Sequence, residues 1–214
     1  MIKAAIFDLD GTLLDSTSVW EKVDEIFLGK RGIEIPDDYA KMLQAMGFQA
    51  AARYTIERFG LQDTPEAIQK EWHELVEEEY KYHIQMKKGA LTYLQKLKEQ
   101  GFLLGVATAL SPALYELVLK NHNIYDMFDF LGSTDMVGKG KEFPDLFLKA
   151  ADVLGVEPCQ CAVYEDILAA MKGAGKAGMQ VWGVYDEASA DDWDQICDFA
   201  DFTVQDWEEA SIPE

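Results

Sequence analysis

Hydrophobic residues occur in this chain in two different arrangements, and the first is a set of short apolar runs. One run lies at the amino terminus, and four more follow after residue 88, each bounded by polar or glycine-containing segments. Short continuous apolar runs are typical of strands that are covered on both faces of a parallel sheet. The runs predict strands at 2–7, 102–107, 128–131, 162–164 and 180–184.

Segments with helical spacing of their apolar residues lie between the later runs. They predict helices at 88–100, from Pro112, after Pro144 and at 168–177. Alternating strands and helices are typical of α/β proteins, in which helices cover both faces of a parallel sheet. The sequence therefore predicts a doubly wound, Rossmann-like core, with its ligand site at the carboxyl ends of the strands.

The second arrangement is helical periodicity without any predicted strand, as in the stripe formed by Trp20, Val23 and Phe27. Glycine- and proline-containing breaks divide this part of the chain into about four helices. We therefore expect an all-helical domain that is inserted after the first strand and joined to the core by two hinges. The predicted bounds are 1–15 and 87–214 for the core, 16–86 for the helical domain, and 15–17 and 83–89 for the hinges.

Polar residues that can carry chemistry follow several of the predicted strands. Asp8 and Asp10 follow the first strand, and residues two apart in an extended strand point the same way, so the two carboxylates can converge on one ligand. Gly11 lets the backbone turn directly behind them. Two like charges this close need a cation or a shared proton to offset their repulsion. The alternative interpretation is that these residues form a turn that simply ends the strand.

Composition and charge restrict the possible partners. The chain has 214 residues, of which 49% are hydrophobic and 27% charged, as in ordinary globular proteins. The 19 basic and 39 acidic residues give a net charge of −20, which argues against binding of nucleic acids or anionic membranes. Neither a membrane-spanning run nor a secretory signal is visible, so we expect a cytoplasmic protein.

The cysteines and histidines do not suggest a further site. Cys159, Cys161 and Cys197 cannot all pair with one another, and a lone Cys-x-Cys is a poor zinc motif. The three histidines are scattered among predicted helices, and none lies beside a candidate nucleophile. We expect ordinary packing or surface roles for all six residues.

Four segments resemble, in order and spacing, the motifs of the haloacid dehalogenase superfamily of phosphohydrolases. The first is Asp-x-Asp-Gly-Thr after the first strand, and the second is a strand that ends in Thr. The third is a Gly-Lys-x-x-Pro-Asp segment in which Glu142 replaces the usual proline. The fourth is an acidic pair that is followed by Ile167 and Ala170 where serine and glycine are common. These motifs are Asp8–Thr12, Phe102–Thr108, Gly140–Asp145 and Cys161–Asp166.

The resemblance implies a role for each matching residue. Asp8 would be the nucleophile. Asp10 would donate a proton to the leaving oxygen and later accept a proton from the attacking water. Thr108, the Ala109 amide and Lys141 would bind the phosphoryl oxygens. Lys139 could exchange roles with Lys141, and Thr108 could instead cap the turn that follows it. Mg²⁺ would be held by Asp8, the Asp10 backbone carbonyl and Asp166, with Glu165 binding it directly or indirectly.

The resemblance further implies a magnesium-dependent phosphatase that hydrolyses a small phosphorylated metabolite through an aspartyl phosphate. The inserted helices match an alpha-helical cap of the first type, and Trp20, Phe48 and Arg53 are its candidates for reaching the site. A related sugar phosphomutase of the β-phosphoglucomutase kind is the alternative, although Trp20 and Ala50 stand where those enzymes have histidine and arginine. A binding module with lapsed catalysis is a third interpretation. A monomer is expected.

Overall fold

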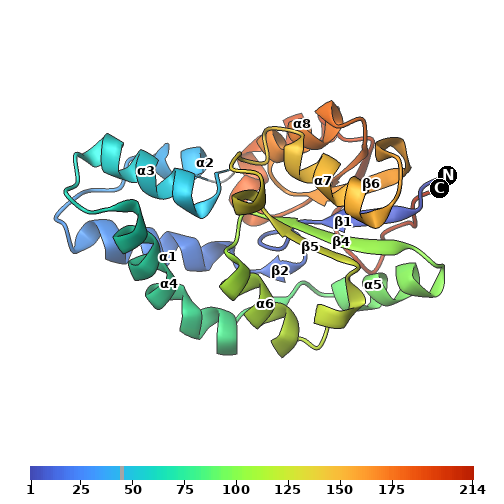
Figure 1. Ribbon diagram of the computed structural model, residues 1–214, viewed down its shortest axis with the longest axis horizontal. Helices are drawn as coiled ribbons and strands as arrows, with labels where there is room; N and C mark the ends of the chain where they lie inside the picture. The colour runs from blue at the N-terminus through green and yellow to red at the C-terminus, as the bar shows by residue number, and fades with distance from the viewer. Residues whose placement is uncertain (44–45) are drawn as a thin grey trace.

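The computed structural model, which describes residues 1–43 and 46–214, is built around a six-stranded parallel sheet (Figure 1). Its strand order is β5-β4-β1-β6-β7-β8, and all neighbouring strands are parallel. This confirms the predicted doubly wound α/β class. The strands are β1 (Ala4–Phe7), β4 (Leu103–Thr108), β5 (Phe130–Ser133), β6 (Cys161–Glu165), β7 (Gln180–Val184) and β8 (Phe202–Val204).

Helices cover both faces of the sheet because the central strands are apolar on both sides. In β1, Ala5 and Phe7 belong to the hydrophobic cluster on one face, and Ala4 and Ile6 belong to the cluster on the other. Helices α5 (Ala90–Glu99) and α6 (Pro112–Asn121) cover the first face. The opposite face is covered by α7 (Asp145–Leu154), α8 (Leu168–Lys176) and α9 (Trp193–Phe199).

Four short 3₁₀ helices lie in the connections of the core. They are η1 (Tyr125–Met127), η2 (Thr134–Met136), η3 (Pro158–Gln160) and η4 (Glu187–Asp192). In the described part of the chain, no helix is both long and apolar enough to cross a membrane.

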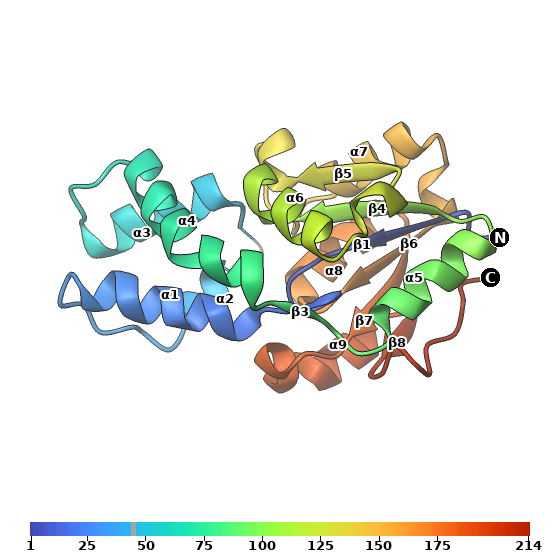
Figure 2. The same ribbon diagram turned by 90° about the horizontal axis from the view of Figure 1, so that it is seen from below.

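A group of four helices, which we call the helical cap, lies beside the sheet at the end where its strands point (Figure 2). Trp72 holds the inside of the cap together, since its ring packs edge-on against Phe27 and Phe48 with centroid distances of 5.5 and 6.0 Å. The helices are α1 (Thr17–Gly29), α2 (Tyr39–Leu43), α3 (Phe48–Phe59) and α4 (Pro65–Tyr82).

A two-stranded antiparallel ribbon lies where the chain enters and leaves the cap. It consists of β2 (Leu14–Asp15) and β3 (Gln85–Met86). The expectation of no strand within 16–86 is therefore wrong at β3, because a two-residue strand is too short to show a period-two pattern. The ribbon falls within or beside the segments predicted as hinges. The domain bounds and the hinge motion themselves stay predictions.

Candidate active site

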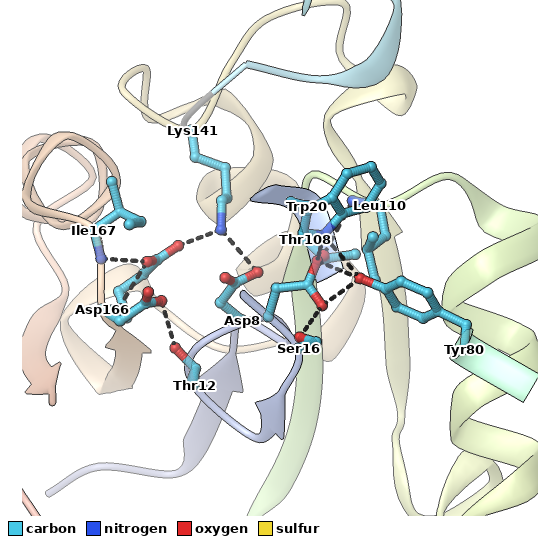
Figure 3. A network of polar contacts seen from close by, with 12 residues as sticks. Asp8, Thr12, Ser16, Trp20, Tyr80, Thr108, Leu110, Lys141, Asp166 and Ile167 are labelled. Carbon is cyan, nitrogen blue, oxygen red and sulfur yellow. Dashed lines mark hydrogen bonds and ion pairs between the residues drawn. The ribbon is translucent and has the colours of Figure 1, made fainter. Parts of the chain in front are cut away.

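The candidate residues meet at the carboxyl end of the sheet because their strands are neighbours. Asp8 follows β1, Thr108 ends β4 and Glu165 ends β6, and β4 and β6 flank β1. Asp166 follows β6 directly, and Lys141 reaches the same place from the loop before α7 (Figure 3). The parallel topology therefore brings together residues that lie up to about 160 positions apart in the sequence.

Lys141 lies between two carboxylates. Its Nζ is 2.8 Å from Asp8 Oδ1 and forms a second ion pair with Glu165, and its side chain is fully buried. The loop that carries Lys141 can approach helix α8 only because residue 173 is glycine, since a Cβ there would lie 1.9 Å from the Lys141 carbonyl oxygen. Lys139 instead pairs with Asp145 at the surface, so it is Lys141 that lies in the site.

The charges around Lys141 keep it protonated. Burial alone would lower its pKa, but the negative charges of Asp8 and Glu165 outweigh burial and hold the pKa above the usual 10.5. Burial also raises the pKa of Glu165, to about 7, although Lys141 opposes the rise. Glu165 Oε2 accepts backbone hydrogen bonds from Asp166 and Ile167, at 3.0 and 3.1 Å.

Three buried carboxylates form a group that can hold a cation. Ligand oxygens of Asp8, Glu165 and Asp166 all lie within 4.8 Å of one another. Asp166 Oδ1 accepts a hydrogen bond from Thr12 Oγ1 at 3.0 Å, whereas Asp166 Oδ2 is buried without a partner. Burial, reinforced by the charge of Glu165, raises the pKa of Asp166 well above 3.8. An all-oxygen group with an unsatisfied buried oxygen fits a hard divalent cation such as Mg²⁺.

The turn after β1 is shaped by the same carboxylates. Gly11 has φ +75°, and a Cβ at this position would lie 2.3 Å from Asp166 Oδ2. Any larger residue would therefore be strained and would displace the carboxylate.

Asp10 does not join this group of carboxylates but is bound by residues of the helical cap, two of which, Trp20 and Tyr80, are labelled in Figure 3. Tyr80 OH donates to both of its carboxylate oxygens, at 2.6 and 2.7 Å. Ser16 Oγ donates to Oδ1 at 2.6 Å, and Trp20 Nε1 donates to Oδ2 at 3.0 Å. Trp20 Nε1 also lies 3.0 Å from Tyr80 OH, which closes the network.

Asp8 and Asp10 nevertheless line the same cavity, so the convergence of their side chains on one ligand stays a prediction. Strand β1 ends at Phe7, so Asp10 lies in a turn, where the period of two no longer applies. Binding of a cation by the Asp10 backbone carbonyl stays a prediction. Burial raises the pKa of Asp10 to about 6, against hydrogen bonds from Ser16 and Tyr80 that lower it.

Thr108 makes the capping contact that the sequence leaves open, and its phosphoryl-binding role stays a prediction. Its Oγ1 accepts a hydrogen bond from the Leu110 backbone at 3.1 Å, so it caps the turn after β4. Thr108 and Ala109 also line the cavity in front of Asp8. The turn therefore holds the hydroxyl in place at the cavity wall.

A cavity of about 360 Å³ separates this site from the helical cap. Its core side includes Asp8, Lys141 and Asp166, and its cap side includes Trp20 and Phe48. Two of the three cap candidates thus reach the cavity.

Arg53, the third cap candidate, does not reach the cavity. It is exposed and is not among the described residues that line the cavity.

Tyr80 is a contact of Asp10 that the sequence analysis does not predict. It follows the acidic run at 74–79, which looks like a solvated helix face. The signal that could have found it is the spacing of Trp72, Val76 and Tyr80, four residues apart, which places all three on one buried face.

Comparison with known proteins gives three kinds of match. The profile of the haloacid dehalogenase-like hydrolase family matches residues 5–184. Hexitol phosphatase B of Escherichia coli (strain K12) is 30% identical over 185 residues, which cover 84% of this chain and 82% of that protein.

Two solved structures have the same fold over nearly the whole chain. β-Phosphoglucomutase from Clostridium difficile superimposes with a TM-score of 0.82 and 23% identity, covering 99% of this chain and 94% of that one. CbbY from Rhodobacter sphaeroides in complex with xylulose-(1,5)bisphosphate gives a TM-score of 0.83 at 22% identity, covering 98% and 96%.

Proposed function

Because the chain belongs to the haloacid dehalogenase-like hydrolase family, whose profile covers residues 5–184, we propose that it hydrolyses a small phosphomonoester through an aspartyl phosphate on Asp8. It is a phosphoester hydrolase, as its similarity to phosphatases across most of the chain indicates. The observation that carries the proposal is the different environments of two aspartates that line one cavity. Asp8 pairs with Lys141, whereas Asp10 accepts a hydrogen bond from Tyr80 of the cap.

In the first half of the reaction, a carboxylate oxygen of Asp8 attacks phosphorus, and the bond from phosphorus to the leaving oxygen breaks. Asp10 gives its proton to that leaving oxygen. A pKa of about 6 suits this exchange, because both protonation states of Asp10 are then accessible near neutral pH. Lys141 and Thr108 stabilise the charge on the non-bridging oxygens.

In the second half, water attacks the phosphorus of the aspartyl phosphate. Asp10 takes a proton from this water, the bond between Asp8 and phosphorus breaks, and Asp8 returns to its carboxylate form. Asp10 thus ends in its protonated state, ready for the next substrate. The two halves release the alcohol and inorganic phosphate in turn.

Mg²⁺ fits the carboxylate group formed by Asp8, Glu165 and Asp166. The unpartnered buried oxygen of Asp166 supports this assignment, as does the all-oxygen donor set. When bound, Mg²⁺ would supply positive charge that offsets these carboxylates and the phosphoryl oxygens.

The size of the cavity supports a small metabolite as the substrate. Its volume of about 360 Å³ is at the lower end for small-molecule sites. Hexitol phosphatase B is named for a substrate of this size, so a sugar or polyol phosphate is the substrate class to test first. We expect the enzyme to act as a monomer.

The test is phosphate release from a panel of phosphomonoesters with and without Mg²⁺. The panel contains p-nitrophenyl phosphate, glucitol 6-phosphate and glucose 1-phosphate. Asp8→Asn is compared with Asp126→Asn, which makes the same change at an exposed position outside the cavity. We expect Mg²⁺-dependent release that Asp8→Asn abolishes and Asp126→Asn retains.

The same panel tests the alternative functions. Conversion of glucose 1-phosphate into glucose 6-phosphate without phosphate release would favour the mutase interpretation. Binding of these compounds without any turnover would favour a binding module.

A further inference from the structure

Asp24 occupies a position of helix α1 where an apolar residue is expected. Trp20, Asp24 and Leu28 are spaced four residues apart, and Asp24 is only 9% exposed. Carboxylates are almost never buried unless they are paired. Within the described part of the chain, Asp24 forms no hydrogen bond and no ion pair, and it lines the cavity opposite the candidate catalytic residues.

Trp72 of helix α4 lines the same cavity and has a polar group without a partner. Its ring packs against Phe27 and Phe48 and is 4% exposed, but its Nε1 is buried without any hydrogen-bond partner. A buried donor without a hydrogen bond destabilises the fold. The cap wall of the cavity thus offers one acceptor, Asp24, that has no described partner, whereas the Trp72 donor is buried in the wall behind it.

The charges around these two groups are mainly negative. Besides Asp24, the outer part of the cavity is lined by Glu21, Asp37, Asp191 and Asp192. The basic residues of the described lining are Lys41, which pairs with Asp192 at 2.6 Å, and Lys141, which pairs with Asp8 at 2.8 Å. No unpaired cation among these lining residues is left to receive a second phosphate or a carboxylate group.

We propose that Asp24 binds hydroxyl groups at the non-phosphorylated end of the substrate, and that the surrounding carboxylates reject substrates with a second anionic group there. The preferred substrate is then a neutral polyhydroxylated monophosphate. This inference rests on the proposed function. It sets the chain apart from CbbY, whose structural complex contains a bisphosphate.

The electrostatics of Asp24 agree with a functional reason for its position. Burial, reinforced by Glu21, raises its pKa to about 7, so the ionised group costs stability at neutral pH. Either protonation state of the carboxyl can accept a hydrogen bond from a hydroxyl. A group that weakens the fold and has no described partner is expected to be kept for a contact that the substrate makes.

The first experiment compares two substrates that differ by one phosphate. Steady-state kinetics are measured on the full chain with fructose 1-phosphate and fructose 1,6-bisphosphate, and p-nitrophenyl phosphate serves as the substrate without hydroxyl groups. We expect kcat/KM for the monophosphate to exceed that for the bisphosphate by about 100-fold, because specificity of this kind comes from repulsion as well as attraction.

The second experiment removes the proposed contact. Asp24→Ala should lower the ratio of kcat/KM for fructose 1-phosphate to that for p-nitrophenyl phosphate about tenfold or more. Asp24→Ala should also reduce the ratio of kcat/KM for fructose 1-phosphate to that for fructose 1,6-bisphosphate. Glu25→Ala, at an exposed position of the same helix, is the matched control and should leave both ratios unchanged.

Binding is measured independently of turnover. Calorimetric titration of Asp8→Asn with fructose 1-phosphate should give a dissociation constant that rises about tenfold when Asp24→Ala is added. Circular dichroism of each variant shows whether it is folded, and Asp24→Asn replaces Asp24→Ala if the latter is not.

The outcomes separate this inference from the proposed function. The inference is overturned, and the proposed function stands, if p-nitrophenyl phosphate is hydrolysed but kcat/KM is the same for the bisphosphate and the monophosphate. The same conclusion holds if Asp24→Ala changes neither ratio of kcat/KM. If none of the three compounds is hydrolysed, the proposed function fails. The inference is then decided by the titration, and an unchanged dissociation constant overturns it.

Discussion

Asp24→Asn should make the protein more stable at neutral and alkaline pH. Burial raises the pKa of Asp24 from 3.8 to about 7, with a smaller contribution from the charge of Glu21. A carboxyl group with a raised pKa binds its proton more tightly in the folded protein than in the unfolded chain. The free energy of unfolding therefore decreases as pH rises from about 4 to about 7, and the full penalty applies above that range.

The size of the effect follows from the pKa. The rise corresponds to about three powers of ten in proton affinity, each worth about 1.4 kcal/mol, so the ionised carboxylate costs about 4 kcal/mol near pH 8. Near pH 5 the same linkage gives about 2 kcal/mol, and below about pH 4 the cost disappears. Asparagine has the same shape but cannot ionise, so Asp24→Asn should gain these amounts relative to the wild-type protein.

Urea unfolding, followed by tryptophan fluorescence and circular dichroism, measures this difference. With a slope of about 2 to 3 kcal/mol per M, a gain of about 4 kcal/mol moves the midpoint up by about 1 to 2 M. Glu25→Gln, an exposed neighbour on helix α1, should change the stability by less than about 0.5 kcal/mol at every pH. If Asp24→Asn is no more stable than the wild-type protein near pH 8, the carboxylate has a compensating partner and our reasoning is refuted.

Three further substitutions test the site and its closure. Tyr80→Phe removes the hydroxyl that donates to Asp10, so kcat should fall about 10- to 100-fold for an alkyl phosphate and less for p-nitrophenyl phosphate, whose leaving group needs no proton. Equal losses of kcat for both substrates would contradict the role of Asp10. Gly47→Ala places a Cβ 2.2 Å from Thr134 Oγ1, where the cap meets the core, and should lower kcat/KM about tenfold. Unchanged kcat/KM would show that this close contact is not needed. Lys141→Met leaves two buried carboxylates without their cation, so the free energy of unfolding measured by urea titration without Mg²⁺ should fall by about 3 to 5 kcal/mol. With Mg²⁺ present, the loss of unfolding free energy should be smaller.

The sheet and the residues at its strand ends could be predicted because their signal is local. The apolar run 180–184 coincides with β7, and the positions after β1 and β6 follow from where the apolar runs stop. The strand predicted at 128–131 lies two residues later, at Phe130–Ser133, and the edge strand Phe202–Val204 was not predicted. An edge strand of three residues with an exposed threonine has no distinctive pattern.

The arrangement around Asp10 could not be predicted, because it depends on tertiary contacts. Tyr80 lies 70 residues from Asp10 in the sequence, and only the packing of the cap against the core brings its hydroxyl to the carboxylate. The close approach of residue 173 to the Lys141 loop is likewise invisible in a single sequence. Sequence patterns thus predicted which residues lie together at the carboxyl end of the sheet but not which of them contact the cap.

The central claim is that Asp8 carries the phosphoryl group during turnover. The most direct test is rapid acid quenching of the wild-type protein during turnover of p-nitrophenyl phosphate with Mg²⁺, followed by mass spectrometry of the peptide that contains Asp8. We predict a mass increase of one phosphoryl group that maps to Asp8, disappears after alkaline treatment and is absent in Asp8→Asn. Rapid turnover without phosphorylation of Asp8 at any quench time, or phosphorylation of another residue, would contradict the account.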